Sequence, residues 1–288
     1  MLASIVFYLA WAAVMTSGRA QSNDVELNDA IQGLVDSFGD SLFQIPSPFT
    51  GQKLEKWDEY SGVNPEELGD YPEGDILFPR ANSPMSRNSL RSARRWRRGY
   101  VPYTLTGSFS SQERRLIDQA FADYAKLTCV RFVPRSTEPD YLFITSDNTG
   151  CWSSVGKTGG AQQLNLQRPG CVTKKGTVVH ELMHALGFLH EQNRWERDNY
   201  VSIKYQNIIR GTESNFEKAQ PKTTDGLGIE YDYGSVMHYS EFAFSSNGLP
   251  TIKAKSPGVT LGQREGLSRN DVKKIRRMYK CNKGKSYV

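Results

Sequence analysis

The chain has 288 residues, of which 38% are hydrophobic and 23% are charged, and it carries a formal net charge of +5. This balance is typical of a folded globular protein and excludes a disordered chain or one largely embedded in a membrane. The length predicts one or two domains with a full hydrophobic core.

The N-terminus predicts a signal peptide over residues 1–20. Its apolar run, LASIVFYLAWAAVM, is too short to indicate a bilayer span, and Gly18 and Ala20 stand at the small-residue positions of a cleavage site. A buried N-terminal helix or strand is the alternative. The signal peptide indicates a secreted, extracellular protein with no membrane span, cleaved near Ala20.

The cysteine content agrees with an oxidising compartment. Four cysteines predict two disulfides, and three pairings are possible. No CxxC spacing occurs, so a thiolate zinc site or a redox motif is not expected. The cysteines are Cys129, Cys151, Cys171 and Cys281.

Charge divides the rest of the chain into two parts. Residues 21–87 hold thirteen acidic and four basic residues, and residues 88–288 hold eighteen acidic and thirty-one basic residues. Complementary potentials of this kind favour docking of an acidic segment on a basic domain. The stretch RNSLRSARRWRRG between them predicts an exposed linker open to a trypsin-like or furin-like protease, and a solvated basic loop is the alternative.

The basic part predicts a mixture of strands and helices. VPYTLTG, CVRFVPR and YLFITS indicate strands, and GCWSSVGKTGGAQQLNL indicates strand and loop. Ser110 and Glu113 form a capping box before a helix whose core face is spaced at i, i+3 and i+4, and Ser268 and Asp271 repeat this signal near the C-terminus. The core face of the first helix comprises Leu116, Ile117, Ala120, Phe121, Tyr124 and Leu127.

Three of the four histidines stand in VVHELMHALGFLHEQNRWERD. On a helix, His180 and His184 lie one turn apart and point the same way. His190 joins them only if the helix ends, and Gly187 can adopt the left-handed conformation that ends it. Three neutral imidazoles with an open position are typical of a catalytic zinc site, at which Glu181 would serve as general base.

The fourth histidine stands in YDYGSVMHYSEF, beside Met237 and Tyr239. A three-histidine motif followed by a methionine turn is the metzincin signature. Within that clan the chain resembles the astacin family over about residues 88–281. The resemblance is carried by HELMHALGFLHEQNRWERD, SVMHY, WRRGYVPYTL, the cysteine spacing and GAQQLNL; in the run Arg194–Asp198, Glu196 replaces the family's aspartate.

The resemblance implies a fold and an activity. The expected fold is α+β, with a twisted mixed sheet, an active-site helix and two subdomains flanking a cleft, preceded by a largely irregular pro-segment. The expected domains are the signal peptide 1–20, the pro-segment 21–87 and the protease domain 88–288. The implied roles are one Zn²⁺ bound by His180, His184 and His190, Glu181 as general base, Tyr239 as an additional ligand that stabilises the tetrahedral intermediate, Met237 as the Met-turn residue, and disulfides Cys129–Cys281 and Cys151–Cys171.

The resemblance also implies latency. Family zymogens carry Phe-x-Gly-Asp, whose aspartate takes the open position on zinc; here PEGDI offers Asp75, with Pro72 in place of Phe. Cleavage near Arg87, within residues 87–98, would free the protease domain, and its new N-terminus would pack near Glu191.

Substrate recognition has two candidates. Family members bind an extended peptide along an edge strand, here near Cys151–Val155, which makes Trp152 a substrate-binding candidate. Arg264 stands where acid-preferring members place an S1′ arginine that would select Asp or Glu. An ordinary surface arginine is the alternative.

Two other function classes remain to be weighed. A catalytically inactive, secreted zinc-binding module would have the same ligands, but the presence of Glu181 favours a protease acting on proteins or peptides. A basic nucleic-acid binder would explain the arginine cluster, but no stacking-aromatic motif accompanies it and secretion disfavours it.

Overall fold

The computed structural model describes residues 46–77, 95–106, 109–219 and 226–282. The predicted signal peptide, the first part of the acidic segment and the region around Arg87 lie outside these ranges. Among the described residues, no helix combines the length and apolarity needed to cross a membrane.

The helix predicted after Ser110 is α5, Ser111–Leu127. Its capping box forms as predicted, because the Ser110 side chain accepts from the Glu113 amide while the Glu113 carboxylate accepts from the Ser110 amide. Four of the six predicted core residues are buried, and Leu116 and Leu127 are partly covered. The helical periodicity therefore identified the face that packs against the protein.

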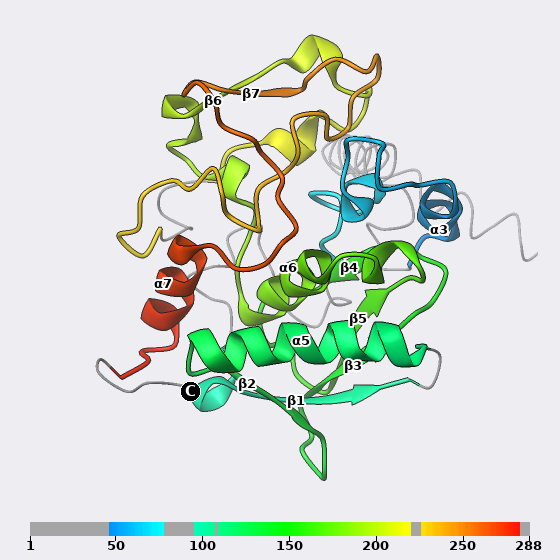
Figure 1. Ribbon diagram of the computed structural model, residues 1–288, viewed down its shortest axis with the longest axis vertical. Helices are drawn as coiled ribbons and strands as arrows, with labels where there is room; N and C mark the ends of the chain where they lie inside the picture. Colours follow the sequence, from blue (N-terminus) through cyan, green and yellow to red (C-terminus); the bar gives the residue numbers. More distant parts are fainter. Residues whose placement is uncertain (1–45, 78–94, 107–108, 220–225, 283–288) are drawn as a thin grey trace, which may run out of the picture.

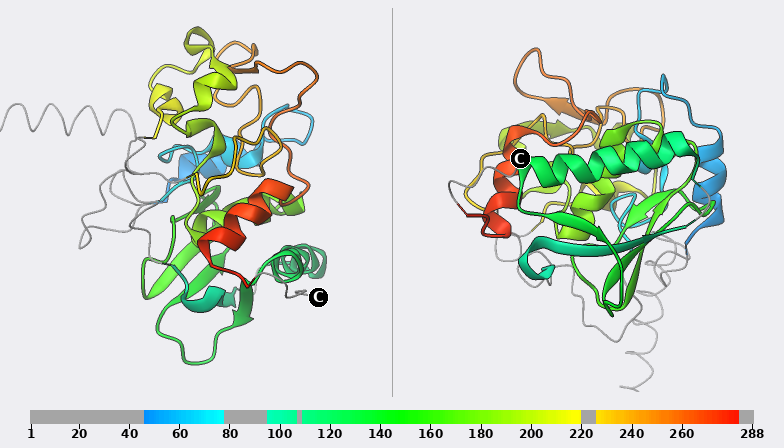
Figure 2. Two further views of the ribbon diagram at one scale, coloured as in Figure 1. Left: turned by 90° about the vertical axis from the view of Figure 1, so that its left-hand side faces the viewer. Right: turned by 60° about the horizontal axis from the view of Figure 1, so that its bottom comes forward.

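A five-stranded mixed sheet lies beneath α5 (Figures 1 and 2). Its order is β2-β1-β3-β5-β4; the first four strands are mutually parallel and β4 pairs antiparallel with β5 at the edge. The strands are β1 Tyr100–Leu105, β2 Arg131–Pro134, β3 Tyr141–Thr145, β4 Cys151–Ser153 and β5 Ala161–Leu166.

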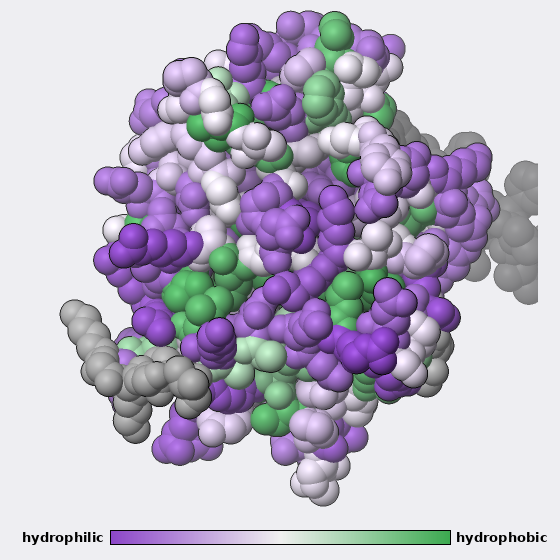
Figure 3. Space-filling model, in the orientation of Figure 1, coloured by the Kyte–Doolittle hydropathy of each residue, from purple (hydrophilic) through white to green (hydrophobic). Residues whose placement is uncertain are grey.

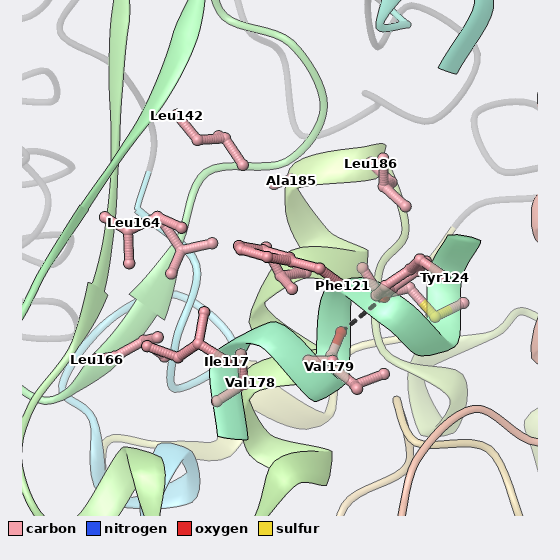
Figure 4. Close-up of a cluster of buried hydrophobic side chains, with 14 of the residues drawn as sticks. Ile117, Phe121, Tyr124, Leu142, Leu164, Leu166, Val178, Val179, Ala185 and Leu186 are labelled. Atoms are coloured by element: carbon pink, nitrogen blue, oxygen red, sulfur yellow. Dashed lines mark hydrogen bonds between the residues drawn. The ribbon is translucent and has the colours of Figure 1, made fainter. Parts of the chain in front are cut away.

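The second helix of this half is α6, Lys175–Leu186, which is buried from Gly176 to its last residue. A helix that is apolar on most sides is typical of an internal helix, and the side chains of α6 meet those of α5 and of the sheet in one buried cluster (Figure 4). The Tyr124 hydroxyl donates to the Val179 carbonyl at 2.8 Å and joins the two helices. Each large side chain buried there contributes about 1.5–3 kcal/mol relative to exposure, so the core holds α6 firmly in place.

The chain after α6 forms a second subdomain with its own core. Strands β6, Val201–Ile203, and β7, Ile252–Ala254, pair antiparallel at the end of the molecule opposite β1 (Figure 1). Helix α7, Arg269–Met278, returns to the first subdomain, where Cys281 is bonded to Cys129. The second disulfide joins Cys151 to Cys171, so both pairs are those that the resemblance implied. The α+β fold with two subdomains is confirmed.

The described part of the acidic segment packs on the basic part of the chain. Helix α3, Pro48–Glu55, approaches so closely that a Cβ on Gly51 would lie 2.0 Å from the Asn148 carbonyl oxygen. The Gln167 side chain donates to the Gly51 carbonyl at 2.9 Å. Beyond α3, the described residues of the segment form a 3-10 turn, Pro65–Leu68, and irregular chain.

The last part of the predicted linker is not a free linker. Trp96 is buried, its indole N–H donates to the Ala185 carbonyl at the end of α6, and Arg97–Gly99 form a 3-10 turn. The tryptophan explains the difference, since its apolar ring finds a place against α6 while the neighbouring Arg97 and Arg98 stay exposed.

Candidate metal centre

Helix α6 presents the first two histidines to a common point. The Nδ1 atom of His180 lies 2.8 Å from the Val236 carbonyl oxygen, and that of His184 lies 2.7 Å from the Phe188 carbonyl oxygen. A carbonyl oxygen only accepts, so each Nδ1 carries the proton and each Nε2 presents a lone pair. The two Nε2 atoms lie 3.1 Å apart.

Gly187 ends α6 and brings in the third histidine. Its backbone is left-handed, with φ 112° and ψ 20°, and its amide donates to the His184 carbonyl at 2.8 Å. Such a turn suits glycine because it has no Cβ to clash. The chain then reverses, and His190 Nε2 comes within 3.2 Å of His180 Nε2.

Asp75 reaches the same point from the acidic segment. Its Oδ2 atom lies 2.9 Å from His180 Nε2 and 3.2 Å from His190 Nε2, and its Oδ1 atom lies 3.3 Å from His184 Nε2. Burial alone would raise the pKa of this carboxyl, but the charge of the facing His190, first among the opposing causes, helps to hold the pKa well below its ordinary range. Asp75 is therefore an anion at this centre.

The four side chains fit a tetrahedral zinc ion. Ligand atoms about 2.0–2.1 Å from one ion lie roughly 3.3 Å apart in tetrahedral geometry. Five of the six separations are 2.9–3.3 Å, close to this spacing, with Asp75 facing His180 and His190 through Oδ2 and His184 through Oδ1, and all four ligand atoms lie within 4.8 Å of one another. The Nε2 lone pairs of His180 and His184 face the Asp75 carboxylate at this point. A bound cation would offset the repulsion among these groups.

Glu181 lies beside this group with a buried carboxylate. Neither of its oxygens has a hydrogen-bond partner among the described residues. Burial raises the pKa of Glu181 well above its ordinary value, and the negative charges of Asp75 and Glu66 raise it further. A carboxylate in such surroundings is poised to accept a proton.

The methionine turn lies beneath the histidines. Met237 is buried, and its carbonyl accepts from the Glu191 amide at 3.0 Å, which ties the turn to the chain after His190. The ring of Tyr239 lies 4.7 Å from that of His190, and its hydroxyl donates to the Glu73 carbonyl of the acidic segment. Tyr239 is thus near the centre but turned to the segment.

The edge strand β4 is covered by the acidic segment. The Ser153 amide donates to the Asp75 carbonyl at 2.9 Å, and the Leu77 amide donates to the Ser153 carbonyl at 3.0 Å, in a parallel bridge. Trp152 is 1% exposed and packs against Tyr71, with ring centroids 6.1 Å apart. An aromatic side chain of the segment, one residue before Pro72, is therefore anchored on the edge strand.

Glu191 is fully paired in this structure. It accepts from Lys274 Nζ on one oxygen, at 2.5 Å, and from Arg194 Nη1 and the Asp232 amide on the other. Burial would raise the pKa of Glu191, but Lys274 and Arg194 lower it below its ordinary value. A pocket lined by Glu191, Arg194 and Lys274 together with Phe188 and Leu227 opens beside it.

Arg264 is not a surface arginine. Only 3% of it is exposed, and its guanidinium is paired with Glu66 of the acidic segment. No sequence pattern marks Glu66 or its neighbour Glu67 as a functional residue. Their NPEEL context signals a capped turn but not the partner that the turn meets.

The molecule has known relatives. The sequence profile described as Astacin (Peptidase family M12A) matches residues 88–280. The zinc metalloproteinase nas-4 of Caenorhabditis elegans is 43% identical over 224 residues, which cover 74% of this chain and 70% of that protein. Embryonic protein UVS.2 of Xenopus laevis is 51% identical over 183 residues, which cover 63% of this chain and 35% of that protein.

A solved structure is also similar. High choriolytic enzyme 1, a hatching enzyme zinc-protease of Oryzias latipes, superposes with a TM-score of 0.60 at 42% identity and covers 64% of this chain and 90% of that one. The chain spans 44% and 60% of two further nematode zinc metalloproteinases, nas-13 and nas-7.

Proposed function

Because the chain belongs to the astacin family of zinc metalloendopeptidases, we propose that it is a secreted peptidase made as a latent precursor. The observation that carries this proposal is Asp75, which reaches from the acidic segment to the three histidines that would bind zinc. The proposed parts are the signal peptide 1–20, the pro-segment 21–87 and the protease domain 88–288. Two disulfides support an extracellular location.

In the proposed mechanism, His180, His184 and His190 hold the zinc through Nε2. When bound, Zn²⁺ would lower the pKa of a water at the open position and polarise the substrate carbonyl. Glu181 accepts the proton of the attacking water and delivers it to the departing amine. Both of its carboxylate oxygens lack a hydrogen-bond partner among the described residues, which leaves them free to take up the proton.

Tyr239 has a second proposed role that depends on removal of the segment. Its hydroxyl now donates to the Glu73 carbonyl. Once the segment has gone, the hydroxyl is free to serve as an additional ligand at rest and to donate to the oxyanion that forms on the substrate. The Met237 turn fixes the chain that carries it.

Latency follows from the position of Asp75. Its carboxylate occupies the space between the three Nε2 atoms that the attacking water needs. The adjacent chain covers β4, along which a substrate would lie, with Trp152 beneath it. A trypsin-like or furin-like protease would cut within residues 87–98, and the burial of Trp96 favours cleavage before that residue.

The new N-terminus would reach the pocket beside Glu191. To meet the carboxylate it must compete with Lys274 and Arg194, which already pair with it. The presence of the pocket supports docking of the new N-terminus beside Glu191. The pairs with Lys274 and Arg194 indicate that the charge of Glu191 stays neutralised whether or not the terminus binds there.

Arg264 would give the active enzyme a preference for acidic side chains. Its guanidinium is buried, and one of its nitrogens, Nη2, has no hydrogen-bond partner among the described residues. A carboxylate of the substrate would satisfy both charge and geometry. The expected substrates are proteins or peptides with Asp or Glu after the cleaved bond.

Asp75→Ala in the full-length chain tests latency. Without the carboxylate, the uncleaved chain should hydrolyse a peptide at least tenfold faster than the wild type, and a zinc chelator should abolish this activity until zinc is restored. Asp58→Ala is the matched control, because Asp58 is an exposed acid of the same segment whose side chain accepts from Tyr60. An Asp75→Ala chain as latent as the control would contradict the proposed latency. A cleaved wild-type chain that binds zinc without hydrolysing peptides would instead indicate an inactive binding module.

A further inference from the structure

Two adjacent acids of the segment are buried at the boundary with the protease domain. The side chains of Glu66 and Glu67 in the turn Pro65–Leu68 have no exposed surface. Burying one carboxylate without a partner is costly, and burying two together adds their repulsion. The partners of these two side chains therefore decide whether the segment docks.

Glu66 is paired with Arg264. Arg264 Nε donates to Glu66 Oε1, and Nη1 donates to the carbonyls of His238, at 3.1 Å, and Gln263, at 2.8 Å. The two carbonyls fix the guanidinium plane. Nη2 and Glu66 Oε2 have no hydrogen-bond partner among the described residues, so the pair is held by charge rather than by complete hydrogen bonding.

Glu67 is held by Ser240 and by its own turn. The Ser240 amide donates to Glu67 Oε1 and the Ser240 hydroxyl donates to Oε2, both at 2.6 Å. Asn64 donates to the same carboxylate from its amide and its side chain. Burial raises the pKa of Glu67; Arg264 opposes this, and Glu66 adds to it.

This pocket adjoins the metal centre. Ser240 follows Tyr239 directly, and the Arg264 carbonyl accepts from the Gly176 amide at the start of α6. A Cβ on Gly176 would lie 2.0 Å from the Arg264 backbone, so glycine is what lets the Arg264 loop sit against the helix that carries His180. Burial is the larger cause of the lowered pKa of His180, and the positive charge of Arg264 lowers it further.

We propose that Glu66 and Glu67 of the acidic segment are a second anchor of latency, because they fill the pocket that Arg264 and Ser240 line. This role rests on the proposed peptidase function. Asp75 blocks the histidines, and the acidic pair occupies the pocket that an acidic substrate side chain would need. Removal of the segment would leave the Arg264 guanidinium and two donors of Ser240 without their carboxylate partners, which favours capture of another carboxylate in their place.

Glu66→Gln in the full-length chain tests the anchor, because the amide keeps the shape and removes the charge. The uncleaved variant should show at least tenfold more peptidase activity than the wild type, and in an Asp75→Ala chain it should raise activity about tenfold again. Glu55→Gln is the matched control: it makes the same change in the same segment, where Glu55 accepts only an exposed hydrogen bond from Asn148. It should stay within twofold of its parent in both backgrounds.

Tryptic removal of the segment supplies the check on folding. Since Glu66 leaves with the segment, the cleaved Glu66→Gln chain should match the cleaved wild type. If it does so and the uncleaved variant is no more active than Glu55→Gln, the second anchor is refuted. If the cleaved wild type has no zinc-dependent activity, the proposed function itself fails.

A variant that does not fold still leaves the pocket testable. The cleaved wild-type enzyme should prefer a peptide with Glu after the cleaved bond over the same peptide with Gln by at least tenfold in kcat/KM. Equal rates on the two peptides would refute the carboxylate pocket and with it the anchor.

Discussion

The substitution Gly187→Ala should weaken metal binding by more than the loss of folding stability alone explains. The φ of Gly187, 112°, lies in the left-handed region, where a side chain costs about 1–2 kcal/mol or more. Gly187→Ala therefore lowers the free energy of unfolding by at least that amount. For a domain of this size, each kcal/mol lowers the melting temperature by about 2–4 °C, so a drop of about 2–8 °C is expected.

Metal affinity should fall more than stability alone explains. The turn at Gly187 sets both the Phe188 carbonyl, which orients His184, and the path to His190. Disturbing the groups that orient zinc ligands typically costs 10–100-fold in affinity. In the cleaved enzyme, the chelator concentration that halves peptidase activity should fall at least tenfold.

Gly211→Ala is the matched control. Gly211 is also left-handed, with φ 93°, and an added Cβ would meet no atom within 4 Å. It should lower the melting temperature by a similar amount and leave the chelator midpoint unchanged. Equal chelator midpoints in the two variants would refute the link between this turn and the third histidine.

Two further predictions concern stability. Glu113 pairs with Arg168 at 2.6 Å; burial would raise its pKa, but Arg168 and the Ser110 amide lower it below 4.5. The stabilisation from this pair is present above pH 4.5 and is lost as the pH falls through the lowered pKa of Glu113. Glu113→Gln should therefore lower the free energy of unfolding in urea by about 1 kcal/mol at pH 7 and by much less near pH 3. A difference between variant and wild type that stays constant with pH would contradict this. Trp96→Phe leaves the Ala185 carbonyl without its indole donor and should cost about 1–3 kcal/mol in thermal unfolding, in both the uncleaved and the cleaved chain, whereas an effect confined to the uncleaved chain would place Trp96 with the segment.

Local patterns made the histidine cluster predictable. A helix is enough to place His180 and His184, four residues apart, on the same side. A single helix end at Gly187 is enough to bring His190 beside them. The capping box before α5 is equally local. In each case the residues in contact are ten or fewer positions apart, so these contacts can be predicted from the local sequence.

Contacts between distant residues could not be predicted in the same way. Glu66 and Arg264 are 198 residues apart, and nothing in NPEEL indicates an arginine as partner. The sequence has Pro72 where the family motif has Phe, and nothing local indicates that the neighbouring Tyr71 packs against the distant Trp152. Trp96 was hidden among arginines, whose charge indicated an exposed linker. Each of these contacts depends on which distant residues the folded chain brings together, and the periodicity of the sequence does not encode this.

The uneven charge of the sequence takes a specific form in the structure. The acidic segment meets the basic domain through three buried carboxylates: Asp75 at the histidines, and Glu66 and Glu67 at Arg264 and Ser240. The Val236 and Phe188 carbonyls, which orient His180 and His184, lie within residues 88–288 and would remain after cleavage, whereas Glu73, whose carboxylate lies 2.8 Å from Nδ1 of His190, would leave with the segment. We therefore expect activation to proceed by dissociation of the segment, with His190 as the ligand that loses its orienting partner, and the rate of dissociation to depend on how many of the three carboxylates are still bound.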